Sequence, residues 1–342
     1  MRAIDEGLAQ ATDVARALVG SAVELNRVFG GGRNSRIWRV RSSAGVFALK
    51  QYPPRRNDHR DRLSTEVGAL RLMEDHRVDT VPRVVGVDDQ HGYALLSWID
   101  GAEVVDIGDD DIDAAVAFLG AIHGLRAAPC SAAQPLAAEA CLSGREILRQ
   151  IEERLTKLQS VTSPEKELID FLEYSFAPRF ANWAAAARIL AGQAGLDFDG
   201  ELPQEWRSLV PSDFGFHNSL RRSDGSLAFV DFEYFGWDDP VKMTADILLH
   251  PGRTLPSAPR ARFRQAATRL YGADDPAFAR RLSAYLPLFG CRWVLIMLNE
   301  FIPELWRRRT LAGDSGSWSE AKTRQLGKAR DFLAALPEKF TE

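Results

Sequence analysis

Hydrophobic and polar residues alternate in two short runs near the N-terminus, residues 36–41 and 46–52, which Ser-Ser-Ala-Gly connects. Alternation of this kind is typical of strands with one buried face, and the short connection predicts a hairpin. Helical periodicity precedes the hairpin over residues 4–19 and follows it from about Asp58 to Asp75. Two more strands, "RVVGVDD" and "YALLSWI", come next. The first hundred residues therefore predict a small, mostly antiparallel sheet with one inserted helix.

The pattern changes after the Asp-Gly pair at residues 100–101. Residues 111–125, 144–159, 164–195 and most of 260–340 are helical in pattern and rich in Ala, Leu, Arg and Glu. An N-terminal β-rich part over residues 1–99 and a larger helical part over residues 100–342 predict an α+β architecture with two lobes. The cleft between two lobes is a common place for a ligand.

Composition narrows the class of protein only a little. The 342 residues are 45% hydrophobic and 26% charged, and the formal net charge of −4 does not suggest a nucleic-acid partner. The three cysteines are scattered without a CxxC pair, which favours a reducing, cytoplasmic compartment. The N-terminus lacks the apolar core of a signal peptide, and the stretch "CRWVLIMLNEFI" looks too short to span a bilayer. We therefore expect no membrane association, and nothing in the sequence indicates an oligomeric state.

The segment "LVPSDFGFHNSLRRSDGSLAFVDFEYFGWDDP" contains two carboxylates next to apolar runs, where unpaired acids are rare. Asp213 follows an apolar pair and a Pro-Ser turn, and Asp231 ends an apolar run that reads as a buried strand. Burying a carboxylate without a partner costs several kcal/mol or shifts its pKa. In phosphoryl transfer, one such acid accepts the proton of the attacking hydroxyl, while another, with an amide such as Asn218, holds Mg²⁺.

Upstream features fit the same chemistry in the same order. The run Gly30-Gly31-Gly32 before Arg33-Asn34-Ser35 would let backbone N–H groups approach phosphate oxygens. Lys50, at the end of "VFALK", could neutralise phosphate charge, and Glu66 on the next helix could hold it. Each feature alone also fits a structural role, as a hairpin turn, a solvated lysine or an exposed helix glutamate.

The motifs "SDFGFHN", "AFVDFE" and "GWDDP" together resemble the catalytic segment of the aminoglycoside phosphotransferase/choline kinase family. The resemblance extends upstream through "GGGRNSRIWRV", "FALK" and "ALLSWIDG", over roughly residues 25 to 250. It implies a protein-kinase-like two-lobed fold, with a nucleotide-binding first lobe, "ALLSWIDG" as the hinge, and a substrate-binding helical lobe.

The resemblance also implies roles for individual residues. Asp213 would be the catalytic base, and Asn218 and Asp231 would bind Mg²⁺, with help from Glu233. Lys50 and Glu66 would form the ion pair that binds the nucleotide phosphates. The expected nucleotide-binding residues are Gly31, Gly32, Asn34, Ser35, Lys50, Glu66, Ser97, Trp98 and Ile99.

The sequence departs from the family pattern at two places. Pro211-Ser212 stand where the family usually has His-Gly before the catalytic Asp, and Met243 replaces a usual acid, with Asp246 further along. The family His braces the loop rather than reacting, so the departure does not exclude activity. His217 could serve as a second base, although a structural role is the better interpretation because Asp213 already fills that position.

The implied activity is an ATP- and Mg²⁺-dependent transfer of phosphate to a hydroxyl of a small molecule. A sugar or sugar derivative is the first expectation for the acceptor, with aminoglycosides and choline- or ethanolamine-like alcohols as alternatives. A nucleotide-binding pseudokinase is the contrasting class. Loss of Lys50, Asp213, Asn218 or Asp231 would favour it, and all four are present. A protein kinase is disfavoured, because no long activation segment ending in Ala-Pro-Glu follows Asp231.

Overall fold

The computed structural model describes residues 2–28, 35–54, 60–161, 165–312 and 317–341. The chain divides into two compact units. Unit 1 comprises Met1–Ala138 and Leu209–Trp237, and unit 2 comprises Glu139–Ser208 and Asp238–Glu342. Unit 1 holds all the strands of the predicted sheet, whereas unit 2 is mainly helical, so the α+β class is confirmed. The lobe boundary predicted between residues 99 and 100 stays a prediction.

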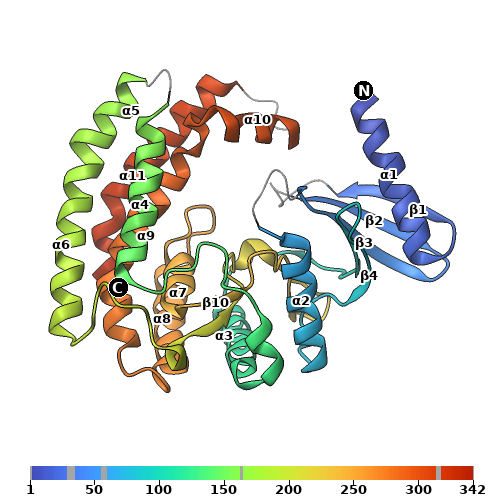
Figure 1. Cartoon of the computed structure of the whole chain (residues 1–342), viewed down its shortest axis with the longest axis horizontal. Coiled ribbons are helices and arrows are strands. Elements are labelled where there is room, and N and C mark those ends of the chain that lie inside the picture. The colour runs from blue at the N-terminus through green and yellow to red at the C-terminus, as the bar shows by residue number, and fades with distance from the viewer. Residues whose placement is uncertain (1, 29–34, 55–59, 162–164, 313–316, 342) are drawn as a thin grey trace. The chain divides into compact units, whose positions relative to one another are not determined.

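Unit 1 is built on a five-stranded antiparallel sheet in the order β1-β2-β3-β5-β4 (Figure 1). Its strands are β1 Val23–Val28, β2 Arg36–Ser42, β3 Gly45–Gln51, β4 Val84–Asp88 and β5 Tyr93–Ser97. A second, three-stranded sheet has the order β6-β8-β9. Its strands are β6 Ala102–Glu103, β8 Ser219–Arg221 and β9 Leu227–Phe229, and β7 Ser208–Val210 pairs with β10 Gly236–Asp238.

One face of the five-stranded sheet forms an apolar core with helix α1, Arg2–Val19. Alternate strand residues supply it because successive side chains of a strand point to opposite faces. The buried members of this core are Ala11, Val14, Ala15, Trp38, Val40, Leu49, Tyr93 and Leu95. Lys50 follows Leu49 on β3 and therefore lies on the opposite face. The predicted hairpin and N-terminal helix are both confirmed.

Helix α2, Arg62–Asp75, begins later than predicted, after the N-cap residue Asp61. The Asp61 carboxylate accepts the backbone N–H of Ser64 at 3.2 Å. This bond caps the N-terminus of the helix, as a short acidic side chain commonly does. The helix buries the predicted apolar face, consisting of Leu63, Val67, Leu70 and Met73, and Glu66 lies in the same buried stripe. Arg62, the first residue of the helix, is buried.

The acidic run at residues 109–113 begins helix α3, Asp109–Gly124. Asp111 accepts the backbone N–H of Gly108 at 2.9 Å, and its carboxylate also pairs with Arg221 of β8 at 2.8 Å. Two 3₁₀ helices, Leu125–Ala127 and Pro129–Ala133, follow α3.

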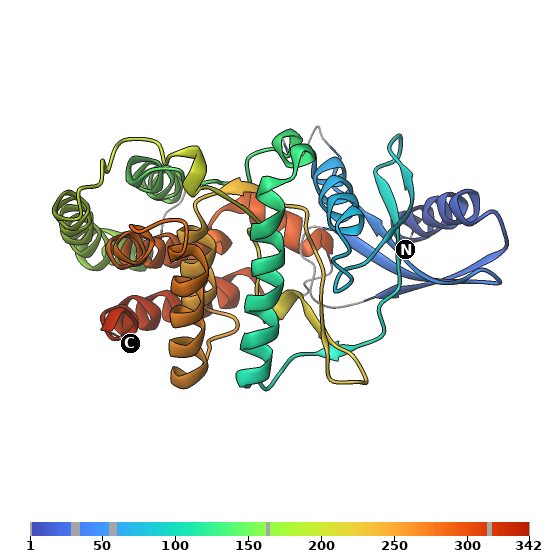
Figure 2. The same cartoon turned by 90° about the horizontal axis from the view of Figure 1, so that it is seen from below.

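Unit 2 surrounds one long apolar helix, α9, with the helices α4, α6, α7, α8 and α11 (Figures 1 and 2). Its helices are α4 Gly144–Gln159, α5 Lys166–Asp170, the π-helical turn Phe171–Phe176, α6 Ala177–Gln193, the 3₁₀ turn Gln204–Trp206, α7 Pro240–Leu249, α8 Ser257–Gly272, α9 Phe278–Met297, the 3₁₀ turn Leu298–Phe301, α10 Pro303–Ala312 and α11 Trp318–Thr341.

The segment Phe278–Phe301 is long and apolar enough, by length and composition alone, to cross a membrane. The apolar run "CRWVLIMLNEFI" begins well inside this longer segment, because the helix starts at Phe278. The most apolar part of this segment is 67% buried inside the protein. A buried core helix can have the same length and apolar composition as a membrane-spanning helix. Packing against the surrounding helices of unit 2 accounts for its composition.

Candidate active site

Lys50 of β3 and Glu66 of α2 form a buried ion pair with a distance of 2.5 Å between Nζ and Oε2. Glu66 also accepts the Tyr52 hydroxyl at 2.8 Å and the backbone N–H of Phe232 at 3.3 Å. Burial disfavours the charged form of Lys50, but the carboxylates of Asp231 and Glu66 outweigh it and hold the pKa well above the usual value. The expected pairing of Lys50 with Glu66 is therefore present in the structure.

Asp231 lies just beyond the fully buried strand β9 and completes the contact with Lys50 at 2.7 Å. Its φ of 71° is in the left-handed region, which is uncommon for any residue but glycine and often marks functional sites. Burial raises the pKa of Asp231 to about 6, with Glu233 and Glu66 adding to the shift and Lys50 opposing it. The side chain is nevertheless 28% exposed, so this anion faces solvent.

Glu233 lies two residues further on and is almost completely buried. One of its oxygens accepts from the Arg62 guanidinium, and the other accepts from the Ser35 hydroxyl at 2.9 Å. Lys50 lies 3.6 Å from the second oxygen. Arg62 also donates to the Tyr234 hydroxyl at 2.6 Å.

The loop with Asp213 and Asn218 is folded by contacts among its own residues. The Asn218 side-chain amide donates to the Asp213 backbone carbonyl at 2.9 Å, and His217 Nε2 lies 3.1 Å from Asp213 Oδ1. The backbone N–H of Val230 donates to the Asn218 carbonyl at 3.0 Å, which joins the loop to the residue before Asp231. This bond joins residues that are 230 − 218 = 12 positions apart, so it holds the two segments next to each other.

Ser212 occupies the position where the family usually has glycine, and the structure shows why glycine suits it. Its φ is 67°, a conformation that glycine adopts without the steric cost that a Cβ brings. The Ser212 hydroxyl donates to the Ala138 carbonyl at 3.4 Å. The loop therefore has a serine in a backbone conformation that favours glycine.

The carboxylates of Glu66, Asp231 and Glu233 offer oxygen atoms that all lie within 4.8 Å of one another. Oxygen donors of this kind suit Mg²⁺, which commonly binds one or two carboxylates together with substrate phosphates. Asp231 is the accessible member of the group. Because the Asn218 amide nitrogen is committed to the Asp213 carbonyl, its amide oxygen is the atom it can offer to a cation. The donor set therefore fits Mg²⁺.

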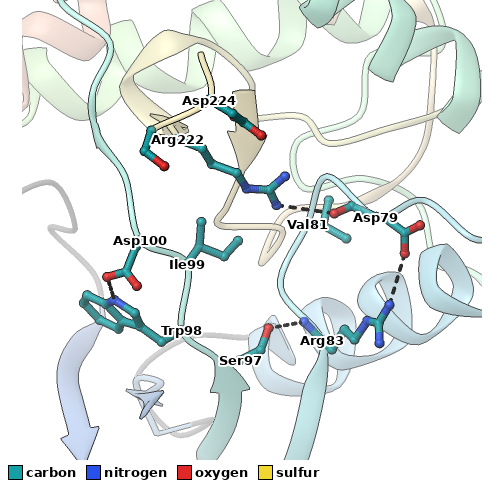
Figure 3. Close-up of a pocket in the computed structure, with 10 residues that line it drawn as sticks. Asp79, Val81, Arg83, Ser97, Trp98, Ile99, Asp100, Arg222 and Asp224 are labelled. Atoms are coloured by element: carbon teal, nitrogen blue, oxygen red, sulfur yellow. Dashed lines mark hydrogen bonds and ion pairs between the residues drawn. The ribbon is translucent and has the colours of Figure 1, made fainter. Parts of the chain in front are cut away.

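Ser97, the last residue of β5, and the next two residues, Trp98 and Ile99, line a cavity of about 470 Å³, shown in Figure 3. The remaining lining residues are Asp79, Val81, Arg83, Asp100, Arg222, Ser223 and Asp224. Arg83 of this cavity donates its backbone N–H to the Ser97 hydroxyl at 2.9 Å, and the Trp98 indole donates to Asp100 at 2.8 Å. Lys50 and its strand neighbours do not line this cavity, so it is separate from the carboxylate cluster.

The expected phosphate-binding residues Gly31, Gly32 and Asn34 lie outside the described residues. Sequence reasoning missed Tyr52 and Arg62, which contact Glu66 and Glu233. Arg62 stands four residues before Glu66, so the two side chains share one face of α2. This spacing was the available signal for Arg62, whereas nothing in the sequence distinguishes Tyr52 from a core tyrosine.

The architecture and the grouping of Lys50, Glu66 and Asp231 define a kinase-like fold. The chain matches the sequence profile of the phosphotransferase enzyme family over residues 26–282, well over half of its length. The protein belongs to this family. The family resemblance noted in the sequence is thereby confirmed.

Solved structures share the fold at low sequence identity. A choline/ethanolamine kinase family protein from Mesorhizobium loti is 18% identical, with a TM-score of 0.56 over 95% of this chain and 99% of its own. Choline kinase LicA from Streptococcus pneumoniae is 14% identical, with a TM-score of 0.57 over 96% and 99%. Spectinomycin phosphotransferase APH(9)-Ia, solved with ADP and spectinomycin, is 10% identical, with a TM-score of 0.57 over 93% and 98%. A search of curated proteins found no match.

Proposed function

We propose that the protein transfers the terminal phosphate of ATP to a hydroxyl group of a small molecule, with Mg²⁺ as the metal. The observation that carries this proposal is the assembly of Lys50, Glu66 and Asp231, which come from a strand, a helix and a loop. Membership of the phosphotransferase enzyme family and the ADP-bound structural relative support it. Three cysteines without disulfides fit the expected cytoplasmic location.

Asp213 is the proposed catalytic base. Its side chain is 46% exposed, so an acceptor hydroxyl can reach it from solvent. The carboxylate would orient that hydroxyl and accept its proton as the new bond to phosphorus forms. His217 contacts the same carboxylate and would hold its orientation, which agrees with the structural role preferred for this histidine.

Lys50 is the proposed phosphate-binding cation, and Glu66 fixes its position. Asp231 and the amide oxygen of Asn218 are the proposed metal ligands. Bound Mg²⁺ would neutralise negative charge on the phosphate oxygens. The residues are held in place before substrate arrives, which lowers the reorganisation needed during transfer. Ser35, together with Gly31, Gly32 and Asn34, would contact the nucleotide phosphates, and Ser97, Trp98 and Ile99 would lie beside the base.

The acceptor is the finer part of the proposal. A sugar gains no support from the structural relatives, whose names point to choline, ethanolamine and aminoglycosides. Polycationic aminoglycosides call for accessible acids. Glu300 and Glu304 are the candidate acids for such a contact. Glu300 is 1% exposed and accepts from Gln325, whereas Glu304 is exposed. A choline-like alcohol with a single cationic group is therefore the acceptor we propose first.

A pseudokinase is disfavoured because Lys50, Asp213, Asn218 and Asp231 are all present, and Lys50 and Asp231 are in contact. The deciding experiment measures ADP release from Mg·ATP across a panel containing choline, ethanolamine, aminoglycosides and sugars. Acceptor-dependent turnover that Asp213→Asn abolishes supports the proposal. Nucleotide binding without turnover for any acceptor would favour the pseudokinase.

A further inference from the structure

Glu233 stands in the Asp-Phe-Glu motif, where the resemblance suggested a second metal ligand, but its surroundings are those of a structural anchor. One oxygen accepts from Arg62, and the other accepts from Ser35 at 2.9 Å. The residue is 3% exposed, and Arg62 is 6% exposed. Both partners are therefore withdrawn from solvent and satisfy each other's charge, as buried ions must.

Asp231 differs from Glu233 in both respects. Its side chain is 28% exposed and accepts from Lys50, whose ammonium has three donors. A metal ion can approach Asp231 without displacing a buried guanidinium. Binding the same ion to Glu233 would break a charged pair that is shielded from water, which is costly.

Arg62 connects Glu233 to the Lys50–Glu66 pair through helix α2. Arg62 and Glu66 are four residues apart on α2, so their side chains lie on one face, one turn apart. Arg62 is the first residue of the helix, and it also contacts Tyr234 through the hydroxyl and through the ring face at 4.8 Å. Fixing Arg62 therefore fixes the turn of helix that presents Glu66.

We propose that Glu233 is a positioning residue rather than a metal ligand. Through Arg62 it holds the start of α2, and through Ser35 it holds the residue just before β2, so that Glu66 stays against Lys50. We call Glu233, Arg62 and Ser35 the Glu233 junction. This inference rests on the proposed function for its kinetic consequences, and it revises the metal role expected for Glu233.

The kinetic test separates the two roles of Glu233 by the quantity that changes. Arg62→Met and Glu233→Gln should each raise the KM for nucleotide about tenfold, the effect of losing a hydrogen bond to a charged group. The free Mg²⁺ needed for half-maximal turnover at saturating ATP should stay within about twofold of wild type. The double variant should be little worse than either single one, because both substitutions remove one shared interaction. Arg62→Lys should recover most of the loss.

A metal role for Glu233 predicts the opposite pattern. Glu233→Gln would then raise the Mg²⁺ requirement about tenfold or more, while Arg62→Met would leave it and the nucleotide KM unchanged. That result would overturn the proposal. Arg149→Met is the matched control, because Arg149 also pairs with glutamates, but on the exposed surface of α4 in unit 2.

Hydrogen–deuterium exchange tests the junction without any assumption about catalysis. In the nucleotide-free protein, amides of α2 should exchange faster in Arg62→Met and Glu233→Gln than in wild type or Arg149→Met. Unchanged exchange in both junction variants would refute the positioning role. Failure of wild type to bind Mg·ATP would instead refute the proposed function, and the exchange result would still decide the role of the junction.

Discussion

Both compact units bury a lysine among carboxylates, but the two clusters differ in charge balance. The cluster of unit 1 consists of Lys50, Arg62, Glu66, Asp231 and Glu233. Among the described residues, three carboxylates there face two cations, and Asp231 is the most exposed of the three carboxylates. The formal excess of one negative charge, next to an opening to solvent, provides a place for a further cation.

The cluster of unit 2 consists of Lys242, Arg154, Arg292, Glu139, Asp238 and Asp246. Among the described residues, its three carboxylates face three cations. Asp238 is fully buried, and burial raises its pKa to about 7. The comparison teaches that a buried ion cluster is not by itself a functional signal. An uncompensated charge with access to solvent is the more informative feature.

The largest expected effect comes from removing the base proposed for unit 1. Asp213→Asn should lower kcat by about 10³-fold, within the range for loss of a general base, while Mg·ATP still binds. Steady-state kinetics and nucleotide titration measure the two quantities. His217→Ala should cost much less, because it alters only the orientation of the carboxylate. Turnover retained in Asp213→Asn would assign the base to His217.

Substituting the lysine pair of unit 1 should give the next largest effect. Lys50→Met should reduce kcat/KM about 100-fold, because the phosphates lose a fixed cation, and Glu66→Gln should reduce it about tenfold. The reduction in kcat/KM of the double variant should be clearly smaller than the product of the two single reductions, since the residues share one interaction. Independent effects would mean that Glu66 does not hold Lys50 in the active enzyme.

Removing a carboxylate should change the folding stability in opposite directions in the two clusters. Because burial raises the pKa of Asp231 to about 6 from 3.8, the folded protein binds this proton more tightly than the unfolded chain. The wild type therefore loses stability as pH rises from about 4 to 6, because the buried carboxyl of Asp231 ionises. Asp231→Asn removes this loss because the amide does not ionise. Thermal unfolding should show a higher Tm for Asp231→Asn at pH 7 and no gain below pH 4.

Asp246→Asn should instead lower the Tm at pH 7, because Lys242 and Arg292 are buried and lose a counter-ion. The expected cost is about 3 kcal/mol, typical of breaking a buried ion pair. Equal stability changes in Asp231→Asn and Asp246→Asn would contradict the distinction between a cluster with excess negative charge and a balanced cluster.

The smallest expected effect concerns Tyr52. Tyr52→Phe removes a hydrogen bond to Glu66 but keeps the ring beneath Lys50, with the ammonium 5.0 Å from the ring centre. One such bond contributes about 1 kcal/mol, so the nucleotide KM should rise about fivefold or less with little change in kcat. A matched substitution, Tyr271→Phe in the core of unit 2, should leave the kinetics unchanged.

Local pattern sufficed for most of the fold. Alternation predicted β2 and β3, and helical spacing predicted the buried face of α2. The start of α2 was misplaced because its N-cap, Asp61, lies in a run of charged residues that has no periodicity to mark the boundary. The bounds of α9 within the helical region predicted over 260–340 were not predicted, because Pro287 and the arginines near its start interrupt the apolar pattern.

For the site, residues within one motif were predictable and contacts between motifs were only partly so. Spacing and resemblance predicted roles for Asp213, Asn218 and Asp231, and these roles stay predictions. The Arg62–Glu233 pair joins positions 171 residues apart, and no local pattern encodes such a contact. The positioning role that we propose for Glu233 rests on burial and hydrogen bonding in three dimensions.

Calorimetric titration of Mg·ATP into wild type, Asp231→Asn and Asp246→Asn tests the central claim most directly, namely that the open cluster of unit 1 is the metal–nucleotide site. Wild type and Asp246→Asn, at a temperature where both are folded, should bind with the same affinity. Asp231→Asn should bind at least about 100-fold more weakly, because it loses the accessible metal ligand. Equal affinity for Asp231→Asn would show that this carboxylate is a strand-end acid without a role in the metal site.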